Sequence, residues 1–345
     1  MDWTDPDVEE VADGVHRIPL PLPMDGLRAV NVYAIVGPTG VTLIDGGWRI
    51  DSAQAALDVA LAGLRLSAAD VGRCLVTHHH RDHYTLAVGL RRRTGMPVAL
   101  GAGEKANLDV IQSADSGLQQ QRVQLEGAGA RHVAEQLGRV VLSDEARADY
   151  EDPDEWLDDG DEIRLEDRQL RVRTTPGHTL GHVVFMDDRA GLIFAGDHIL
   201  PHITPSIGFQ AAPAQLPLAD YLASLALVLA EPDRVLLPAH GPAGGSTHAR
   251  IHELLAHHDT RLDQTRAAVA AGAGTPFEAA QALGWTRRRR TLAELDLFNQ
   301  MLAILETQAH LDVLVAQGRV YRRTESGLRT YQTSPPGAGA ALSPG

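Results

Sequence analysis

The chain has 345 residues, of which 44% are hydrophobic and 22% charged, a composition typical of folded globular proteins. No uninterrupted apolar run reaches about 18 residues, and residues 1–10 are acidic with no apolar core, so we expect neither a membrane span nor a secretory signal. The single cysteine, Cys74, excludes an internal disulfide framework and indicates a reducing, cytoplasmic location.

The net charge of −14 is unevenly spread. Residues 1–250 carry 21 Lys and Arg against 36 Asp and Glu, whereas residues 251–345 carry 10 against 9. The acidic first part should repel polyanions unless bound cations offset its charge. The 16 histidines gather in short clusters, which is unusual for surface histidines.

The first hundred residues predict alternating strands and a helix. In chain order these are strands at 14–18 (ended by Pro19, Pro21 and Pro23), 31–36 and 41–44, a helix at 52–64 capped by Ser52, and strands at 73–77 and 97–100. A Gly-Pro-Thr-Gly turn joins the second and third strands as a hairpin. The strand–helix–strand order predicts a layered α/β fold.

The rest of the chain predicts a helical stretch at 104–150, a second run of strands and a helical end. The predicted elements are strands at 162–165, 170–174, 183–186, 192–195 and 235–237, helices at 219–230, 251–271 and 291–317, and a short hairpin at 318–331. We therefore predict a catalytic domain over 1–249 with a helical insertion at about 104–150, a winged-helix-like domain over 250–332, and a disordered tail over 333–345.

The clearest chemical signal is the segment His78-His79-His80-Arg81-Asp82-His83, which directly follows the strand at 73–77. Imidazoles and carboxylates packed so densely are costly to bury without a counter-charge, and a divalent cation removes that cost. Both groups are ligands that zinc and neighbouring transition metals accept. The alternative is a loose surface histidine tract.

Three further strands end in the same way, which favours the metal site. His178 follows the strand at 170–174, Asp197 and His198 follow the strand at 192–195, and His240 follows the strand at 235–237. Each of these positions adjoins a glycine, which lets the backbone approach closely.

These residues resemble the signature of the metallo-β-lactamase superfamily, over roughly residues 10–245. The resemblance implies a four-layer αββα sandwich with the site at one edge. It implies that His78, His80 and His178 bind a first metal, that Asp82, His83 and His240 bind a second, and that Asp197 bridges the two. Zinc is the expected metal, with iron and manganese also suited to the ligands.

Five nearby polar residues are kept apart from the ligands. His79 lies between two ligands and should point away from the site. His182 is a candidate outer partner of the ligands, and His198 and His202 are candidates for the pocket wall. Asp45, at the end of an early strand, either occupies a turn before Gly46 or resembles the family position that hydrogen-bonds a ligand.

The implied reaction is hydrolysis of a carbonyl substrate. Two metals about 3.5–4 Å apart can share a water and lower its pKa, and the resulting hydroxide would attack the carbonyl carbon. Either Asp82 or the leaving group's own water would handle the proton, and the sequence does not decide between them. Asp197 disfavours a true β-lactamase, since that branch lacks an acidic bridging ligand, and it resembles glyoxalase II-like thioesterases, lactonases and nucleases.

A thioester or ester of the acyl-CoA or acyl-glutathione type is the favoured substrate, because the acidic catalytic part does not favour a polyanion. The insertion could form a lid over an acyl chain; its candidate lining residues are Leu108, Ile111, Leu118, Val123, Leu125 and Leu137, for which ordinary helix packing is the alternative.

Two other substrate classes stay open. The basic run at 287–290 and a winged-helix-like module would suit a metal-dependent endoribonuclease, although nucleic acid is the less favoured partner. A lactonase or a β-lactamase-like amide hydrolase is the other alternative. A non-catalytic relative should have lost a ligand, and none is missing. The C-terminal module could also support a homodimer.

Overall fold

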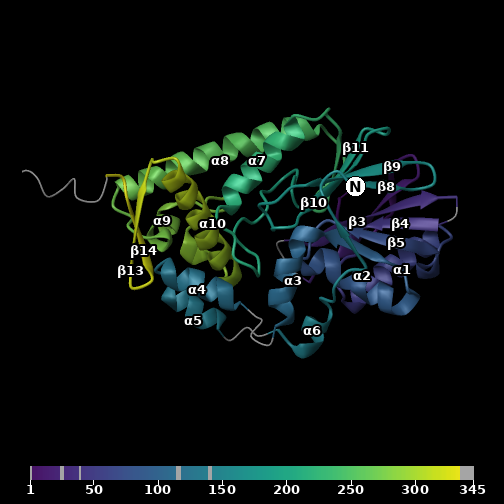
Figure 1. Ribbon diagram of the computed structural model, residues 1–345, viewed down its shortest axis with the longest axis horizontal. Helices are drawn as coiled ribbons and strands as arrows, with labels where there is room; N and C mark the ends of the chain where they lie inside the picture. Colours follow the sequence, from purple (N-terminus) through teal and green to yellow (C-terminus); the bar gives the residue numbers. More distant parts are fainter. Residues whose placement is uncertain (1, 24–26, 39, 114–117, 139–141, 335–345) are drawn as a thin grey trace, which may run out of the picture. The chain divides into compact units, whose positions relative to one another are not determined.

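The computed structural model describes residues 2–23, 27–38, 40–113, 118–138 and 142–334, and Figure 1 shows its ribbon. The chain divides into two compact units. Unit 1 is made of Met1–Ala114, Ser143–Pro205 and Asp220–Glu253, and unit 2 is made of Asp115–Leu142, Ser206–Ala219 and Leu254–Gly345. This division differs from the predicted single boundary at 249/250, because the chain enters unit 2 twice before its C-terminal segment.

Two mixed sheets form the framework of unit 1. Among the described residues, the first sheet has seven strands in sequence order: β1 (Glu9–Ala12), β2 (Val15–Pro21), β3 (Ala29–Gly37), β4 (Gly40–Ile44), β5 (Val71–Val76), β6 (Val98–Gly101) and β7 (Glu155–Leu157). The second sheet has the order β12-β11-β10-β9-β8, with β8 (Glu162–Arg164), β9 (Gln169–Thr174), β10 (Val183–Asp187), β11 (Leu192–Gly196) and β12 (Val235–Pro238).

One apolar core joins the two sheets. Tyr33, Ile44 and Leu75 of the first sheet share a buried cluster with residues of the second sheet such as Phe185 and Phe194. The rings of Tyr33 and Phe194 meet edge to face, with centroids 5.5 Å apart. The predicted strands alternate or are wholly apolar, as a sheet buried on one or both faces requires.

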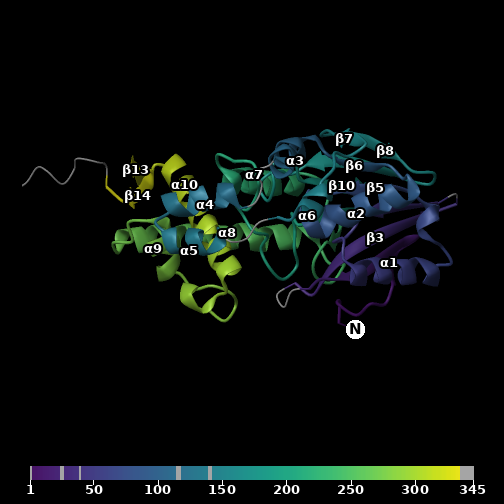
Figure 2. The ribbon, with the colours of Figure 1, turned by 90° about the horizontal axis from the view of Figure 1, so that it is seen from below.

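Helices cover the outer sides of this sandwich. Helix α1 (Asp51–Gly63) packs against β2, and α2 (Arg81–Thr94) packs against β5 and β6. Figure 2 shows α1 on the opposite side of β3 from β10. Helix α7 (Pro217–Leu229) is fixed to the second sheet's loops, since the Ser224 hydroxyl donates to the Pro176 carbonyl at 2.8 Å. The layered α/β sandwich predicted from the sequence is confirmed.

Two local predictions in this unit were wrong. Pro19 does not end the strand that was predicted at 14–18. That strand is β2, which continues through Pro21 and pairs with β3 over its whole length. Strand β1 reaches only as far as Arg17 along β2, so both prolines lie where one edge of the strand is unpaired and a missing N–H costs nothing. Helix α1 begins after Ile50, so Ser52 is not its cap.

Unit 2 is mainly helical. It contains α4 (Gln119–Gly127), α5 (Arg131–Leu137), α9 (Pro276–Ala282), α10 (Leu297–Ala316), the later part of α8 (Thr247–Ala270), and a hairpin of β13 (Tyr321–Glu325) and β14 (Leu328–Gln332). The short 3₁₀ turn η3 (Leu292–Glu294) also belongs to unit 2, whereas η1 (Ala68–Asp70) and η2 (Ala102–Glu104) belong to unit 1. Helices followed by a hairpin match the expected order of elements, and the winged-helix-like character stays a prediction. Residues 335–345, most of the predicted tail, lie outside the described residues.

The predicted insertion at 104–150 does not form one lid. Helices α3 (Lys105–Gln112) and α6 (Asp144–Ala148) belong to unit 1, whereas α4 and α5 belong to unit 2. Leu125 and Leu137 are buried in a core shared with α9 and α10, and Leu118 packs against the same core. Leu108 and Ile111 are buried in unit 1, and Val123 is 55% exposed. Ordinary helix packing therefore accounts for all of these apolar residues except the exposed Val123.

No helix among the described residues combines the length and the apolar character that crossing a membrane requires.

Candidate metal centre

The ligand-bearing loop follows a buried strand and opens a helix. Strand β5 ends at Val76, His78 is fully buried, and α2 begins at Arg81. Asp82 and His83 therefore lie in the first turn of α2, where the helix dipole favours a carboxylate. The strand and the helix fix both ends of the loop, so its side chains are held in place by rigid elements on either side.

The other predicted ligands reach the same place from the second sheet. His178 follows β9, Asp197 directly follows β11, and His240 follows β12. Gly196 has φ of +50°, and a Cβ there would lie 2.7 Å from Thr77 Oγ1 and 2.8 Å from His182 Nε2. Only glycine fits both the backbone conformation and the space, which confirms the expected close approach at this strand end.

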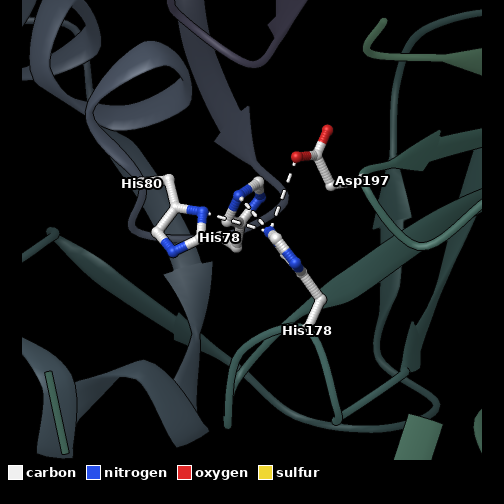
Figure 3. A group of neighbouring side chains, drawn as sticks. All are labelled: His78, His80, His178 and Asp197. Atoms are coloured by element: carbon white, nitrogen blue, oxygen red, sulfur yellow. Dashed lines mark hydrogen bonds and ion pairs between the residues drawn. The ribbon is translucent and has the colours of Figure 1, made fainter. Parts of the chain in front are cut away.

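Four side chains form a first group, shown in Figure 3. The Nε2 atom of His178 lies 3.3 Å from His78 Nε2, 3.0 Å from His80 Nδ1 and 3.5 Å from Asp197 Oδ2. In a tetrahedral zinc site with bonds of about 2.0–2.1 Å, neighbouring ligand atoms stand about 3.3 Å apart. The observed separations are therefore those of ligands around one small cation.

Asp82, His83 and His240 form a second group. His240 Nε2 lies 3.4 Å from Asp82 Oδ2, and His83 Nε2 lies 3.8 Å from the same oxygen. Asp197 Oδ1 is 3.6 Å from His83 Nε2 and 3.4 Å from His240 Nε2. One oxygen of Asp197 thus faces each group, which is the arrangement of a bridging carboxylate.

The residues fit a divalent metal centre on two counts. His83 Nε2 and Asp197 Oδ1 are buried and have no hydrogen-bond partner among the described residues. A buried polar atom without a partner is costly, and a cation placed between these atoms would satisfy both. The donors are imidazole nitrogens and carboxylate oxygens, the ligand types that zinc, iron and manganese share.

Outer hydrogen bonds orient the ligand rings. Asp45 Oδ2 accepts from His83 Nδ1 at 2.9 Å, which leaves Nε2 of that ring directed into the second group. Asp45 Oδ1 accepts from the backbone N–H and the hydroxyl of Thr77 at 2.8 and 3.0 Å. His240 Nδ1 donates to the Ala29 carbonyl at 2.9 Å. Asp45 thus orients the ring of His83, a predicted ligand, and it also occupies the turn, with φ of +61°.

Burial and neighbouring charges set the protonation states. Burial, together with the surrounding imidazoles, lowers the pKa of His78 and His80 well below the usual value, so both rings are neutral and able to bind a cation. Burial alone would raise the pKa of Asp82, but His83 and His240 outweigh it and lower that pKa. Burial alone would lower the pKa of His83, and three carboxylates, Asp45 foremost, raise it to about 10.

The remaining histidines do not join either group. His182 Nε2 accepts from the Asp197 backbone N–H at 3.2 Å, and its Nδ1 therefore donates to Thr175 Oγ1 at 2.8 Å. His198 is buried beside the rings of His182 and Tyr221. His202, predicted to line the pocket, is exposed in the loop after β11.

His79 points away from both groups, as expected, and reveals a residue that the sequence did not indicate. Its Nδ1 lies 2.7 Å from Oε2 of Glu104, a fully buried carboxylate. Burial alone would raise the pKa of Glu104, but His79 and hydrogen bonds from Thr179 and Asn107 outweigh it and lower that pKa. A lone Glu at a predicted helix start carries no signal for this role, because two of its partners, His79 and Thr179, lie far away in sequence.

Known proteins resemble this chain over nearly all or over part of its length. A probable metallo-hydrolase, YqjP, of Bacillus subtilis strain 168 is 25% identical over 326 residues, which are 92% of this chain and 96% of that protein. A hydroxyacylglutathione hydrolase of Methylococcus capsulatus strain Bath is 29% identical over 150 residues, 42% of each protein.

Two solved structures have the same fold over nearly the whole chain. A metallo-beta-lactamase family protein from Thermus thermophilus superposes with a TM-score of 0.77 at 29% identity, covering 94% of this chain and 100% of that chain. A beta-lactamase domain protein from Burkholderia ambifaria gives a TM-score of 0.73 at 26% identity, covering 95% of both chains. Residues 25–240, well over half of the chain, match the family profile, and the protein belongs to the metallo-beta-lactamase superfamily.

Proposed function

We propose that this protein is a dinuclear metal-dependent hydrolase that cleaves a thioester or an ester. The observation that carries the proposal is the orientation of Asp197, whose two carboxylate oxygens each lie 3.4–3.6 Å from ligand nitrogens of a different group. A carboxylate that served a single cation would not need a second set of nitrogen donors on its other oxygen.

The chain's own residues divide the work. His78, His80 and His178 would hold one cation, Asp82, His83 and His240 would hold the other, and Asp197 would contribute one oxygen to each. Two divalent cations in such a site supply Lewis acidity and lower the pKa of water. We assign the acceptance of a proton to Asp82, whose side chain keeps 15% exposure and can be reached by solvent. Zinc is our choice of metal, with iron and manganese as the alternatives that metal analysis separates.

The substrate class rests on likeness and charge. The partial match to a hydroxyacylglutathione hydrolase, a name that denotes thioester cleavage, favours an acyl-glutathione or acyl-CoA substrate. Positions 1–250 hold 36 acidic and 21 basic residues, and this negative net charge disfavours a polyanionic substrate. We therefore propose that the protein belongs to the glyoxalase II-like branch of the superfamily.

A substrate panel on metal-loaded protein tests the proposal. The panel holds an acyl-CoA, an acyl-glutathione, a lactone, a cephalosporin and single-stranded RNA. We expect turnover of a thioester or an ester, loss of that turnover in His80→Ala, and full activity in the control His252→Ala, which removes an exposed histidine of α8.

Other results of the panel would change the proposed substrate or contradict the metal site. RNA cleavage that weakens steeply with salt, together with inert thioesters, would transfer the function to an endoribonuclease while keeping the metal site. Turnover of only the lactone or the cephalosporin would assign a lactonase or an amide hydrolase. Equal activity before and after complete removal of metal would contradict the dinuclear site itself.

A further inference from the structure

Glu104 lies at the centre of a buried hydrogen-bond cluster outside both ligand groups. Its Oε2 atom accepts from His79 Nδ1 at 2.7 Å and from Asn107 Nδ2 at 2.8 Å, and its Oε1 atom accepts from the Thr179 hydroxyl. The side chains of His79 and Glu104 are 3% and 0% exposed. A charge buried this deeply is stable only when it is fully hydrogen-bonded, and this carboxylate is.

Two of the three partners of Glu104 come from the two loops that carry the first group. His79 lies between the ligands His78 and His80, and Thr179 directly follows the ligand His178. The backbones are also in close contact here, since a Cβ on Gly181 would lie 2.0 Å from Glu104 N. One carboxylate after β6 therefore joins a loop of the first sheet to a loop of the second.

The link reaches the ligand atoms through short paths. The ring of His79 contacts the ring of His80 edge to face, with centroids 4.9 Å apart. The two ligands on either side of the link, His80 Nδ1 and His178 Nε2, are only 3.0 Å apart. A shift of either loop would change this separation directly.

The second group is oriented by different partners. His83 is held by Asp45, and His240 is held by the Ala29 carbonyl. The Glu104 carboxylate, in contrast, accepts its hydrogen bonds from His79, Asn107 and Thr179. The two groups can therefore respond differently when the Glu104 cluster is altered.

We propose that Glu104 is a positioning residue that holds the His78–His80 loop against the His178 loop and thereby sets the affinity of the first metal site, but not of the second. The proposal rests on the proposed dinuclear function. Outer partners of metal ligands typically contribute about 10–100-fold in metal affinity, and Glu104 acts on three of the four first-group ligands at once.

The experiment measures metal content and Co²⁺ binding in the full-length protein. Metal-free wild type, Glu104→Ala, Glu104→Gln and Thr179→Val are titrated with Co²⁺, followed by its visible absorption, and are separately challenged with a chelator after zinc loading. The thermal stability of each metal-free variant is recorded. His178→Ala and His240→Ala identify which titration step belongs to which group.

Two controls separate positioning from general damage. Asp187→Ala removes another buried carboxylate of unit 1, which accepts from the Ala190 N–H at 2.8 Å and pairs with Arg168 at 3.6 Å, away from both groups. Thr179→Val removes one hydroxyl with little change of volume, so it reports on the link even if Glu104→Ala does not fold.

We expect Glu104→Ala to weaken the His178-dependent step by about 10–100-fold and to leave the His240-dependent step within about 3-fold. Glu104→Gln and Thr179→Val should show smaller losses in the same step, and Asp187→Ala should show none. Equal weakening of both steps, or no weakening in any variant, overturns the proposal for Glu104. A wild-type protein that binds fewer than two equivalents overturns the dinuclear function instead, so the two failures are distinguishable.

Discussion

Asp45 combines an unusual backbone conformation with hydrogen bonds that orient a neighbouring histidine. It has φ of +61°, a left-handed conformation that Asp and Asn tolerate better than other side chains apart from glycine. From there its carboxylate accepts hydrogen bonds from Thr77 and from His83. The sequence left two interpretations of Asp45 open, as a turn residue or as the partner of a ligand. The structure shows the turn conformation and the hydrogen bond to His83, and the ligand role of His83 stays a prediction.

Replacing Asp45 by Asn isolates the carboxylate from the turn, because Asn keeps the left-handed preference. We expect Asp45→Asn to weaken the second metal site by about 10–100-fold, since His83 loses the charged acceptor that fixes its ring. The loss should fall mainly on the His240-dependent step of a Co²⁺ titration, with a smaller effect on the first site through Thr77.

Asp58→Asn, which changes a partly exposed carboxylate that pairs with Arg93, is the matched control and should bind both metals normally. Unchanged metal binding in Asp45→Asn would show that the hydrogen bond to His83 does not orient the ligand.

At the scale of elements, predictions succeeded where the signal is local. The hairpin of β3 and β4, the strands β5, β9, β11 and β12, and the polar residues that follow them were all indicated by short stretches of sequence. Because the ends of these strands meet at one edge of the sandwich, a pattern repeated four times along the chain predicted a single site in space.

Predictions failed where partners are distant in sequence. The helical stretch after β6 has the pattern of packed helices, but nothing in it indicates that α3 joins one core and α4 and α5 another. Glu104 was missed for the same reason, since Thr179, which binds it, is 75 residues away. Strand β1 was also missed, and with it the reason why prolines are tolerated in β2.

Gly46 couples the end of β4 to the helix that carries Asp82 and His83. A Cβ at this position would lie 2.6 Å from both the Cβ and the backbone N of Ala87 in α2, and the Gly46 N–H donates to the His83 carbonyl at 2.8 Å. We expect Gly46→Ala to destabilise the protein by about 1–3 kcal/mol, because α2 must move to accept the methyl group. Denaturant unfolding measures this loss.

Gly63→Ala is the matched control for that substitution. Gly63 is the last residue of α1, and a Cβ there would have no neighbour within 4 Å. This substitution should be neutral or should stabilise the protein by about 0.4–1 kcal/mol, because alanine lowers the conformational entropy of the unfolded chain. Equal stability of the Gly46 and Gly63 variants would contradict the tight packing of α2 on the β4 end.

At the scale of the whole molecule, the shared fold extends beyond the matched family profile. The profile ends at residue 240, whereas the Thermus thermophilus and Burkholderia ambifaria structures cover 94% and 95% of this chain. The helical C-terminal region is therefore part of the architecture that these proteins have in common. All seven proposed ligands nevertheless belong to unit 1.

Bound metal should contribute measurably to the free energy of unfolding of this chain. Without cations, several buried imidazoles and carboxylates face one another with unsatisfied atoms, whereas the unfolded chain exposes them to water. A ligand present at 100 times its Kd stabilises the native state by about 2.7 kcal/mol. We expect complete chelation to lower the Tm by roughly 5–10 °C, and zinc to restore it.

The comparison variant for this measurement is the double substitution of His178 and His240 by Ala, which removes one ligand from each group. Its Tm should no longer respond to chelator or zinc, whereas His252→Ala should respond like the wild type. Because His178 and His240 lie in loops of the second sheet and the other proposed ligands mostly follow β5, bound metal would act as a cross-link between the two sheets. A wild-type Tm that is the same with and without metal would mean that the protein alone holds these loops together.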